Sequence, residues 1–289
     1  MKALLVGLGG IGSNVYLPQL EKLGYSVTTV DKVGDADFID VSDVNDQFDV
    51  AVICTPNFTH ESIARTLATQ CATIFIEKPG LPSADAWRTL CNDYPNTRFI
   101  MCKNNLYRKS FGALDDAISS KDDITSIEIS WHNNDRVPNP GTWFTNKKLA
   151  WGGVALDLFP HLYCHLWKIA GLDTKRSATS KTQMWDLAQL SQTAYGKVDP
   201  TGTYNVADHA VDTRTWNNIP VTLSASWKSG VDNQSVRVHT IDSTYEWRFG
   251  LCPDYAYGEM IEYGQTEDYD FHKQLDLWIH EQLEIFNEC

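Results

Sequence analysis

The feature that most constrains this chain is a glycine loop placed directly after a short apolar run. Ala3-Leu4-Leu5-Val6 leads straight into Gly7-Leu8-Gly9-Gly10-Ile11-Gly12, which has the pattern G-x-G-x-x-G. In such a loop Gly7 permits a tight turn, Gly9 lets the backbone approach a pyrophosphate, and Gly12 lets the next helix pack closely on the strand. The pattern therefore predicts a strand, a phosphate-binding loop and a helix, with a glycine-rich turn of another α/β protein as the alternative.

Length and composition predict a folded protein of two domains. The 289 residues exceed the roughly 100–200 residues of one domain. The net charge of −13, with no basic stripe, argues against a nucleic-acid partner. No stretch approaches the roughly 18 consecutive apolar residues of a membrane span, and the N-terminal run is too short for a signal peptide. We therefore expect a cytoplasmic protein without a membrane partner.

The seven cysteines also fit a reducing compartment. Their number is odd and they form no C-x-x-C pair, so reduced thiols are expected. They stand at positions 54, 71, 91, 102, 164, 252 and 289.

Strand and helix signals alternate through the first hundred residues. The pattern predicts strands at 2–6, 26–31, 48–54, 72–76 and 98–102, a possible short strand at 38–39, and helices at 11–24, 59–69 and 83–93. This rhythm is typical of a doubly wound parallel sheet. We expect a Rossmann domain that binds a dinucleotide over residues 1–106.

Beyond residue 106 the pattern changes to strand-like segments with fewer helices. Strands are expected near 124–131, 203–216, 220–229, 234–241 and 244–249, with an apolar segment at 150–171 and an amphipathic helix at 271–286. We expect an α+β domain over 107–289, with a mostly antiparallel open sheet, that binds substrate and makes oligomer contacts.

Asp31 follows the second expected strand, nineteen residues after Gly12. An acidic residue at this place can accept hydrogen bonds from the ribose diol of adenosine, and it repels a 2′-phosphate. The sequence thus favours NAD over NADP, although Lys32 could soften that preference. A solvated turn aspartate is the alternative.

Two segments carry residues suited to proton transfer. Glu77-Lys78-Pro79 follows an apolar strand at the expected carboxyl edge of the sheet, where Lys78 could hydrogen-bond a substrate hydroxyl. Asp157 and His161 are four residues apart, so on a helix the carboxylate could orient the imidazole. Pro160 must then sit in a first turn or kink the helix. Solvated strand ends are the alternative for Lys78. A metal site that adds His165 is a weak alternative, and none is predicted.

Five segments, in this order, resemble the family of glucose-fructose oxidoreductase, inositol dehydrogenase and MocA. They are the glycine loop, Cys54-Thr55-Pro56-Asn57 with His60, Glu77-Lys78-Pro79, Asn105 to Arg108, and Gly152-Gly153 through Asp157 and His161. The resemblance covers roughly the first 170 residues. It departs at Phe159 and Pro160, where the family usually has a glycine and a variable residue, and at Cys164, where an aspartate often follows the histidine.

The resemblance implies a catalytic group of Lys78, Asp157 and His161, with His161 taking or giving the alcohol proton. The residues expected to bind NAD or NADP are Gly7, Gly9, Gly10, Ile11, Gly12, Asp31, Lys32, Cys54, Thr55, Pro56, Asn57, His60, Glu77, Lys78 and Asn105. Substrate contacts are expected from Lys78, Arg108, Trp131, Asn133, Asn134, Arg136, Trp143, Lys147 and His161, although ordinary polar loop and sheet positions explain most of these equally well.

We therefore expect an NAD(P)-dependent oxidoreductase that interconverts a secondary alcohol and a ketone on a sugar, polyol, amino sugar or nucleotide sugar. A homodimer or homotetramer is expected. Two alternatives remain: an NAD-dependent glycosidase of the same family, and a dinucleotide sensor without turnover. The three catalytic residue types argue against the sensor, because a sensor does not need them.

Overall fold

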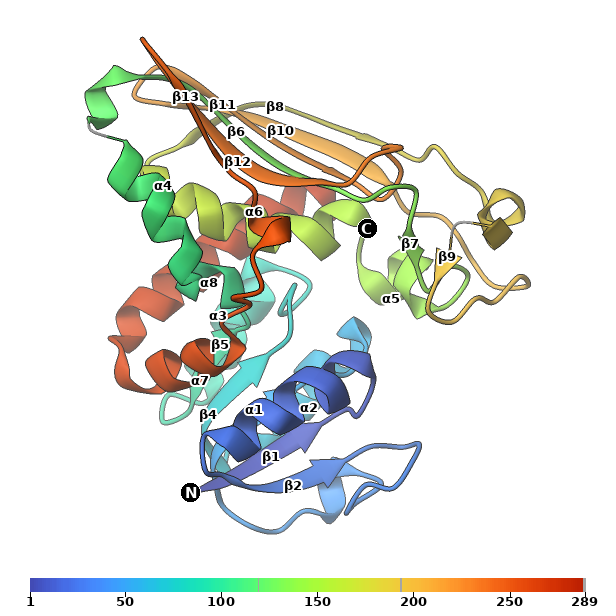
Figure 1. Ribbon diagram of the computed structural model, residues 1–289. Helices are drawn as coiled ribbons and strands as arrows, with labels where there is room; N and C mark the ends of the chain where they lie inside the picture. Colours follow the sequence, from blue (N-terminus) through green and yellow to red (C-terminus); the bar gives the residue numbers. More distant parts are fainter. Residues whose placement is uncertain (119, 193, 288–289) are drawn as a thin grey trace. The chain divides into compact units, whose positions relative to one another are not determined.

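The computed structural model describes residues 1–118, 120–192 and 194–287, which form two units (Figure 1). The N-terminal unit contains Met1–Asn104 together with Tyr257–Ile285, and the C-terminal unit contains Asn105–Ala256 together with the chain end from Phe286. The expected division placed all of 107–289 in the second domain. The structure differs, because the segment 257–285 returns to the N-terminal unit.

The N-terminal unit is built on a five-stranded parallel sheet of order β2-β1-β3-β4-β5. Its strands are β1 (Lys2–Val6), β2 (Ser26–Val30), β3 (Phe48–Ile53), β4 (Cys71–Ile76) and β5 (Arg98–Met101). The last four residues of β1 are all buried, as are those of β3 and β4. Continuous apolar strands of this kind are typical of a sheet covered on both faces, so the expected α/β class is confirmed.

The expected short strand near residue 38 is reduced to a single bridge. Phe38 pairs in parallel with Val30 on the outer side of β2. Counting this bridge as a strand, the order becomes that of a Rossmann sheet, 3-2-1-4-5-6. The chain reverses its direction of winding between β1 and β3, and ligands of such sheets bind at this point.

Four helical segments of this unit lie within a few residues of the predicted ones, whereas α7 was not predicted. The helices are η1 (Gly12–Tyr16) with α1 (Leu17–Lys22), α2 (His60–Leu67), α3 (Ala84–Asp93), α7 (Tyr257–Thr266) and α8 (Tyr269–Leu283). The first helix ends two residues before Gly24, which has a φ of +82°. A glycine there can take the left-handed conformation that ends a helix. Ser83 caps α3 by accepting a hydrogen bond from the Ala86 N–H.

The last helix was expected to pack on a core, and the structure shows which core. Leu275, Ile279 and Leu283 of α8 are buried, and α8 contacts α3 and β5 of the N-terminal unit. It therefore covers the edge strand of the Rossmann sheet, which leaves less backbone of β5 open to another strand.

The C-terminal unit contains a six-stranded sheet of order β13-β12-β6-β11-β10-β8. Its strands are β6 (Ile124–His132), β8 (Lys175–Thr182), β10 (His209–Trp216), β11 (Ile219–Ser226), β12 (Asn233–Thr240) and β13 (Thr244–Trp247). β6 and β11 pair in parallel, and the other neighbours pair antiparallel. The sheet is thus mixed and mostly antiparallel, as expected. The strand predicted from 203 begins only at His209, because residues 203–208 form a loop.

One long helix, α6 (Val154–Ala170), lies along one face of this sheet and contacts β6, β10 and β11 (Figure 1). The smaller elements are α4 (Gly112–Ala117), α5 (Lys147–Ala150) and the paired short strands β7 (Val137–Pro138) and β9 (Ala194–Tyr195). Of the seventeen residues of α6, fourteen are buried. The apolar segment predicted at 150–171 is therefore the central helix of this unit.

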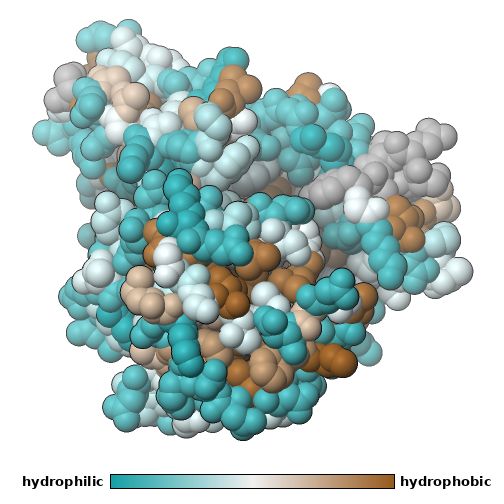
Figure 2. Space-filling model, turned by 60° about the horizontal axis from the view of Figure 1, so that its bottom comes forward, coloured by the Kyte–Doolittle hydropathy of each residue, from teal (hydrophilic) through white to brown (hydrophobic). Residues whose placement is uncertain are grey.

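The surface mixes polar and apolar residues. Figure 2 shows hydrophobic and hydrophilic residues interspersed over one face of the molecule. Large hydrophobic side chains such as Val33, Ile241 and Leu251 are exposed one by one along the chain, which is ordinary for a globular protein. Within the described ranges, no helix is long and apolar enough to cross a membrane. The described cysteines carry free thiols, and Cys289 lies outside the described residues.

The buried His280 of α8 is expected to make the protein less stable in acid. Its Nδ1 lies 2.6 Å from the Asp276 carbonyl, and its Nε2 lies 3.1 Å from the Leu81 N–H, so the ring is held as a neutral tautomer. Burial lowers the pKa of His280 to about 4. The unfolded chain, with a histidine pKa near 6.5, takes up a proton between these values. The free energy of unfolding is therefore expected to fall as pH drops below about 6.5, by about 2 kcal/mol at pH 5.

Urea unfolding at pH 7.5 and pH 5 measures this effect. His280→Gln removes the titrating group, so its difference from wild type is expected to shrink at pH 5. An equal difference at both pH values would show that His280 does not titrate on unfolding.

Candidate active site

The carboxyl edge of the N-terminal sheet is formed by loops held in register by backbone hydrogen bonds. Gly7 donates to the Val30 carbonyl, Cys54 to that of Val6, and Glu77 to that of Ile53. The glycine loop, the Thr55 loop and the Glu77-Lys78-Pro79 loop thus follow adjacent strands. The structure brings these three predicted segments together.

The glycine loop has the backbone that a dinucleotide requires. Gly7 has a φ of +96°, and a Cβ there would lie 2.8 Å from the Cys54 carbonyl oxygen. A Cβ on Gly12 would lie 2.0 Å from the Gly7 oxygen. By contrast, a Cβ on Gly9 or Gly10 would meet no atom within 4 Å. The first and last glycines are needed for packing, and the middle ones leave open space where a phosphate can approach.

A helix begins directly at this loop. Residues 10–22 are helical, with the π-helical turn η1 in the middle, and the Ser13 N–H donates to the Gly9 carbonyl. N–H groups at a helix start attract anions. The loop and the helix start therefore fit the pyrophosphate of a dinucleotide.

Asp31 lies against the same loop. Its carboxylate accepts hydrogen bonds from the backbone N–H groups of Leu8 and Val33. The carboxylate is therefore held beside the glycine loop, where the sequence predicts a ribose contact. That contact, and the one predicted for Lys32, stay predictions.

His60 ties two of the loops together rather than facing solvent. Its ring is fully buried, with Nδ1 2.8 Å from the Gly80 carbonyl and Nε2 2.9 Å from the Thr55 carbonyl. Burial lowers its pKa, although both carbonyl hydrogen bonds act in the opposite direction. In this place His60 holds the Thr55 loop against the loop that carries Lys78. Its predicted cofactor contact stays a prediction.

Glu77 is a buried carboxylate supported by Tyr16. The Tyr16 hydroxyl donates to Glu77 Oε1 at 2.6 Å, and the Lys78 N–H donates to Oε2 at 3.1 Å. Burial raises the pKa of Tyr16 well above its usual value, so its hydroxyl stays protonated and remains a donor. Lys78 itself is half-buried, and its peptide bond to Pro79 is cis. The first helix thereby fixes the segment that presents Lys78.

In the C-terminal unit, α6 carries Asp157 and His161 one turn apart, as predicted. Pro160 lies in the interior of α6 and not in its first turn. The helix continues through it, although Pro160 has no N–H for the Leu156 carbonyl and its ring crowds that carbonyl. Gly153 precedes the helix, and a Cβ there would lie 2.0 Å from the Ala207 oxygen. This explains why a glycine stands directly before α6.

Trp227, which the sequence did not single out, holds Asp157. Its indole Nε1 donates to Asp157 Oδ2 at 3.0 Å, and the residue is fully buried just after β11. Phe144 packs on Trp227 with ring centroids 5.8 Å apart. Because Trp227 and Asp157 are 70 positions apart in sequence, no local sequence pattern predicts this contact. The only available signal was a tryptophan at the end of an expected strand.

His161 lies beside Trp131, with ring centroids 5.1 Å apart and planes at 31°. Trp131 in turn packs on Phe249 at 5.4 Å. Trp143 packs on Phe144 at 5.1 Å. Trp131 therefore lies beside His161, and Trp143 lies beside Phe144, which packs on Trp227. Both tryptophans are predicted substrate contacts, and their rings could provide stacking faces for a sugar ring.

The polar candidates for substrate binding have different surroundings. Arg108 is buried, and its guanidinium donates to the carbonyls of Phe249 and Cys252 and to the carboxylate of Asp254. Asn105 accepts a further bond from it at 3.2 Å. Arg108 is thus engaged within the C-terminal unit.

Asn133, Asn134 and Arg136 follow β6. The Asn133 N–H donates to the Ser226 carbonyl at 2.8 Å, and exposed Arg136 pairs with Asp232. Their substrate contacts, like those of Arg108, stay predictions.

His165 belongs to an aromatic core. Its ring is fully buried between Trp247 and Phe249, at centroid distances of 5.0 and 4.6 Å. Burial lowers its pKa well below the usual value. Among the residues that the structure describes, no group of three or more His, Cys, Asp or Glu side chains could hold a metal ion.

Comparison with known proteins bears on the first of the two units. Residues 1–94 match the family model described as oxidoreductase family, NAD-binding Rossmann fold (GFO_IDH_MocA). This segment is thus similar to the NAD-binding part of that family. The match covers the first three of the five segments on which the resemblance rests, and it supports the expected oxidoreductase.

A longer relative is a protein of Amycolatopsis mediterranei (strain S699) named as a UDP-kanosamine synthase oxidoreductase subunit. It is 26% identical over 284 residues, covering 88% of this chain and 77% of its own length. Similarity therefore extends beyond the Rossmann segment into the C-terminal unit.

Solved structures share the fold at low identity. GenD2 from gentamicin A biosynthesis, in complex with NAD, has a TM-score of 0.78 at 16% identity and covers 98% of this chain and 92% of its own. The WlbA dehydrogenase from Bordetella pertussis, in complex with NADH and UDP-GlcNAcA, has a TM-score of 0.72 at 14% identity, with 99% and 95% covered. Levoglucosan dehydrogenase, in complex with NADH and levoglucosan, has a TM-score of 0.69 at 15% identity, with 98% and 96% covered. These likenesses show the fold.

Proposed function

We propose that this protein is an NAD-dependent dehydrogenase that interconverts a secondary alcohol and a ketone on a sugar or a sugar derivative. The observation that carries the proposal is the placement of Asp157 and His161 one turn apart on α6, with Asp157 held by Trp227. A carboxylate so placed can orient an imidazole for proton transfer. The relatives that act on or bind sugars support the substrate class.

In this proposal, bound NAD supplies a hydride acceptor. His161 takes the proton of the substrate hydroxyl, and Asp157 stabilises the imidazolium that forms. Lys78 hydrogen-bonds the same oxygen and stabilises its developing negative charge. Trp131 and Trp143 provide apolar faces for the sugar ring. In the reverse direction His161 returns the proton to the ketone oxygen.

The reaction is tested by following absorbance of the reduced nicotinamide over a panel of polyols, sugars, amino sugars and nucleotide sugars. Stoichiometric NADH release with one of them supports the dehydrogenase. Release of a free sugar from a glycoside without net reduction would instead support the NAD-dependent glycosidase. Light scattering of the purified protein tests the homodimer or homotetramer that belongs to this proposal.

Asp31 is expected to set the cofactor preference. Its carboxylate, beside the glycine loop, repels a 2′-phosphate. Asp31→Ser is therefore expected to weaken NAD binding about tenfold or more and to lessen discrimination against NADP, because it removes a charge-assisted hydrogen bond to the ribose. Fluorescence titration with both reduced cofactors measures this. Asp37→Ser is the control, because the Asp37 carboxylate accepts hydrogen bonds from Thr29 in β2. Unchanged NAD binding in Asp31→Ser would contradict the ribose contact.

Trp227 is expected to act as a positioning residue for Asp157. Trp227→Phe removes the indole N–H that binds the carboxylate and should lower kcat about tenfold, with little change in NAD binding. Trp216→Phe, at another buried tryptophan in β10, provides a matched control for lost packing. Steady-state kinetics separate kcat from KM. Equal loss of activity in both variants would indicate a packing role only.

A further inference from the structure

A cavity of about 220 Å³ lies beside the start of α6 in the C-terminal unit, and its lining is positively charged. Lys147 comes from α5 and Lys181 from β8. The remaining lining residues are Gly152, Gly153, Ala155, Gln183, Asn205, Val206, Ala207 and Phe286. Within the described part of the chain, this lining holds two lysines and no carboxylate. In a protein with a net charge of −13, the cavity is a local exception.

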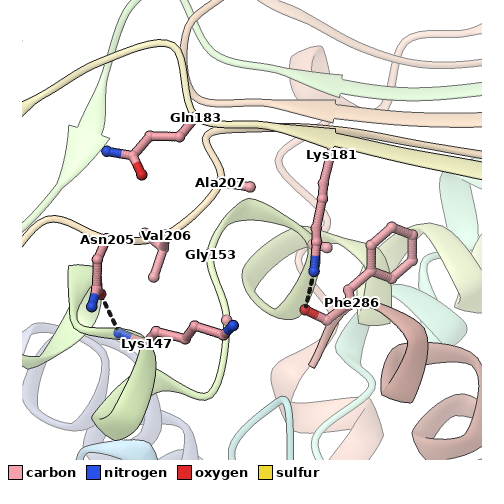
Figure 3. A pocket seen from close by; sticks show the side chains of 10 residues that line it. Lys147, Gly153, Lys181, Gln183, Asn205, Val206, Ala207 and Phe286 are labelled. Carbon is pink, nitrogen blue, oxygen red and sulfur yellow. Dashed lines mark hydrogen bonds between the residues drawn. The ribbon is translucent and has the colours of Figure 1, made fainter. Parts of the chain in front are cut away.

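The cationic side chains reach the cavity from separate elements (Figure 3). The Lys181 side chain extends from β8, and its Nζ lies 3.4 Å from the Phe286 carbonyl oxygen. The Lys147 N–H donates to Asn205 Oδ1 at 2.8 Å. This bond fixes the Asn205 amide through its oxygen, so its Nδ2 is the group that can donate to a ligand. The cavity thus combines two ammonium groups with an amide donor.

The wall of the cavity is preformed by close backbone packing. The Val154 N–H donates to the Ala207 carbonyl at 2.9 Å, which ties the first turn of α6 to the loop after Asn205. A Cβ on Gly153 would lie 2.0 Å from the Ala207 carbonyl oxygen, so this wall has no room for a larger residue there. A preformed wall lowers the ordering cost of binding a small ligand.

Neither Asp157 nor His161 lines this cavity. Ala155 lines it, whereas Asp157, two positions later, binds Trp227. Residues two positions apart on a helix do not face the same way. A group held in this cavity is therefore separate from the hydroxyl that His161 would deprotonate.

We propose that this cavity binds a phosphate group, either that of a phosphorylated sugar substrate or free phosphate. Lysines act on phosphate as mobile point charges, and two of them line this cavity. Pockets for whole ligands measure roughly 300–1,000 Å³, so the cavity suits one group of a larger molecule. The sugar part of the inference rests on the proposed function, but phosphate binding does not require turnover.

The binding test is calorimetric titration with inorganic phosphate in a phosphate-free buffer at low salt. Wild type is expected to bind, and Lys147→Met and Lys181→Met are each expected to weaken binding about tenfold. Lys148→Met, the exposed neighbour in α5 that does not line the cavity, is the matched control and should stay within about twofold. Lys181→Arg keeps the charge and is expected to retain binding. No binding by wild type, or equal binding by all variants, would overturn the proposal.

Kinetics distinguish the two sources of phosphate. If the phosphate belongs to the substrate, the preference in kcat/KM for a sugar phosphate over the free sugar should fall about tenfold in Lys147→Met and Lys181→Met. If free phosphate is the ligand, adding it should change turnover of an uncharged sugar in wild type and not in these variants. Phosphate binding without turnover of any sugar would sustain the cavity site and contradict the proposed function.

Discussion

His161→Gln is expected to lower kcat by about 10³, because it removes the group that takes the hydroxyl proton and general acid–base catalysis contributes about 10²–10⁴. Lys78→Met is expected to lower kcat to a similar extent, since it removes the cation beside the developing alkoxide. Binding of NADH, measured by fluorescence, should change little in His161→Gln, because the glycine loop that fits the dinucleotide belongs to the N-terminal unit. The loss should therefore appear in turnover.

His239→Gln provides the control. His239 lies in β12, not in α6, and its ring contacts Thr244 and Glu128. The pH profile of kcat/KM gives a second readout. Wild type should lose activity on the acidic side as the base is protonated, and His161→Gln should lose that limb. A variant that kept wild-type turnover with a confirmed substrate would remove His161 from the mechanism.

Much of the N-terminal unit was predictable because its signals are local. The apolar run before Gly7 and the alternation up to residue 102 each indicate a strand or a helix from a few consecutive residues. Asp157 and His161 were predictable for the same reason, since four positions on one helix place two side chains on one face. Pro160 removes one hydrogen bond and crowds the Leu156 carbonyl, yet α6 continues past it to Ala170.

Contacts between distant residues were not predictable. Nothing in the sequence around residue 276 indicates that α8 returns to the first sheet, because an amphipathic helix shows that it has a partner and not which partner. The same holds for Trp227 and Asp157. Arg108 has the kind of charged side chain that binds substrates. Its guanidinium instead donates to two carbonyl groups and one carboxylate within residues 249–254. A charge pattern alone does not distinguish an arginine that binds substrate from one whose guanidinium is bonded within its own unit.

The returning helix leads to the largest expected effect on stability. Asp276 of α8 and Lys103 after β5 form an ion pair in which both side chains are almost fully buried. Lys103 Nζ also donates to the Met101 carbonyl at 2.9 Å, and Asp276 Oδ2 accepts the Met101 N–H at 3.0 Å. Burial raises the pKa of Asp276, although the Lys103 ammonium acts in the opposite direction. The pair joins α8 to the edge strand of the Rossmann sheet.

Asp276→Ala leaves the Lys103 ammonium buried without its carboxylate, so it is expected to lower the free energy of unfolding by about 3–5 kcal/mol. The double variant Lys103→Met/Asp276→Leu replaces the pair by apolar side chains and should be more stable than either single variant, because no charge is then left uncompensated. Urea unfolding of wild type, Lys103→Met, Asp276→Leu and the double variant completes the cycle. Additive losses would show that the two residues do not act as a pair, and that α8 is held to β5 by Leu275 and Ile279 without help from the charges.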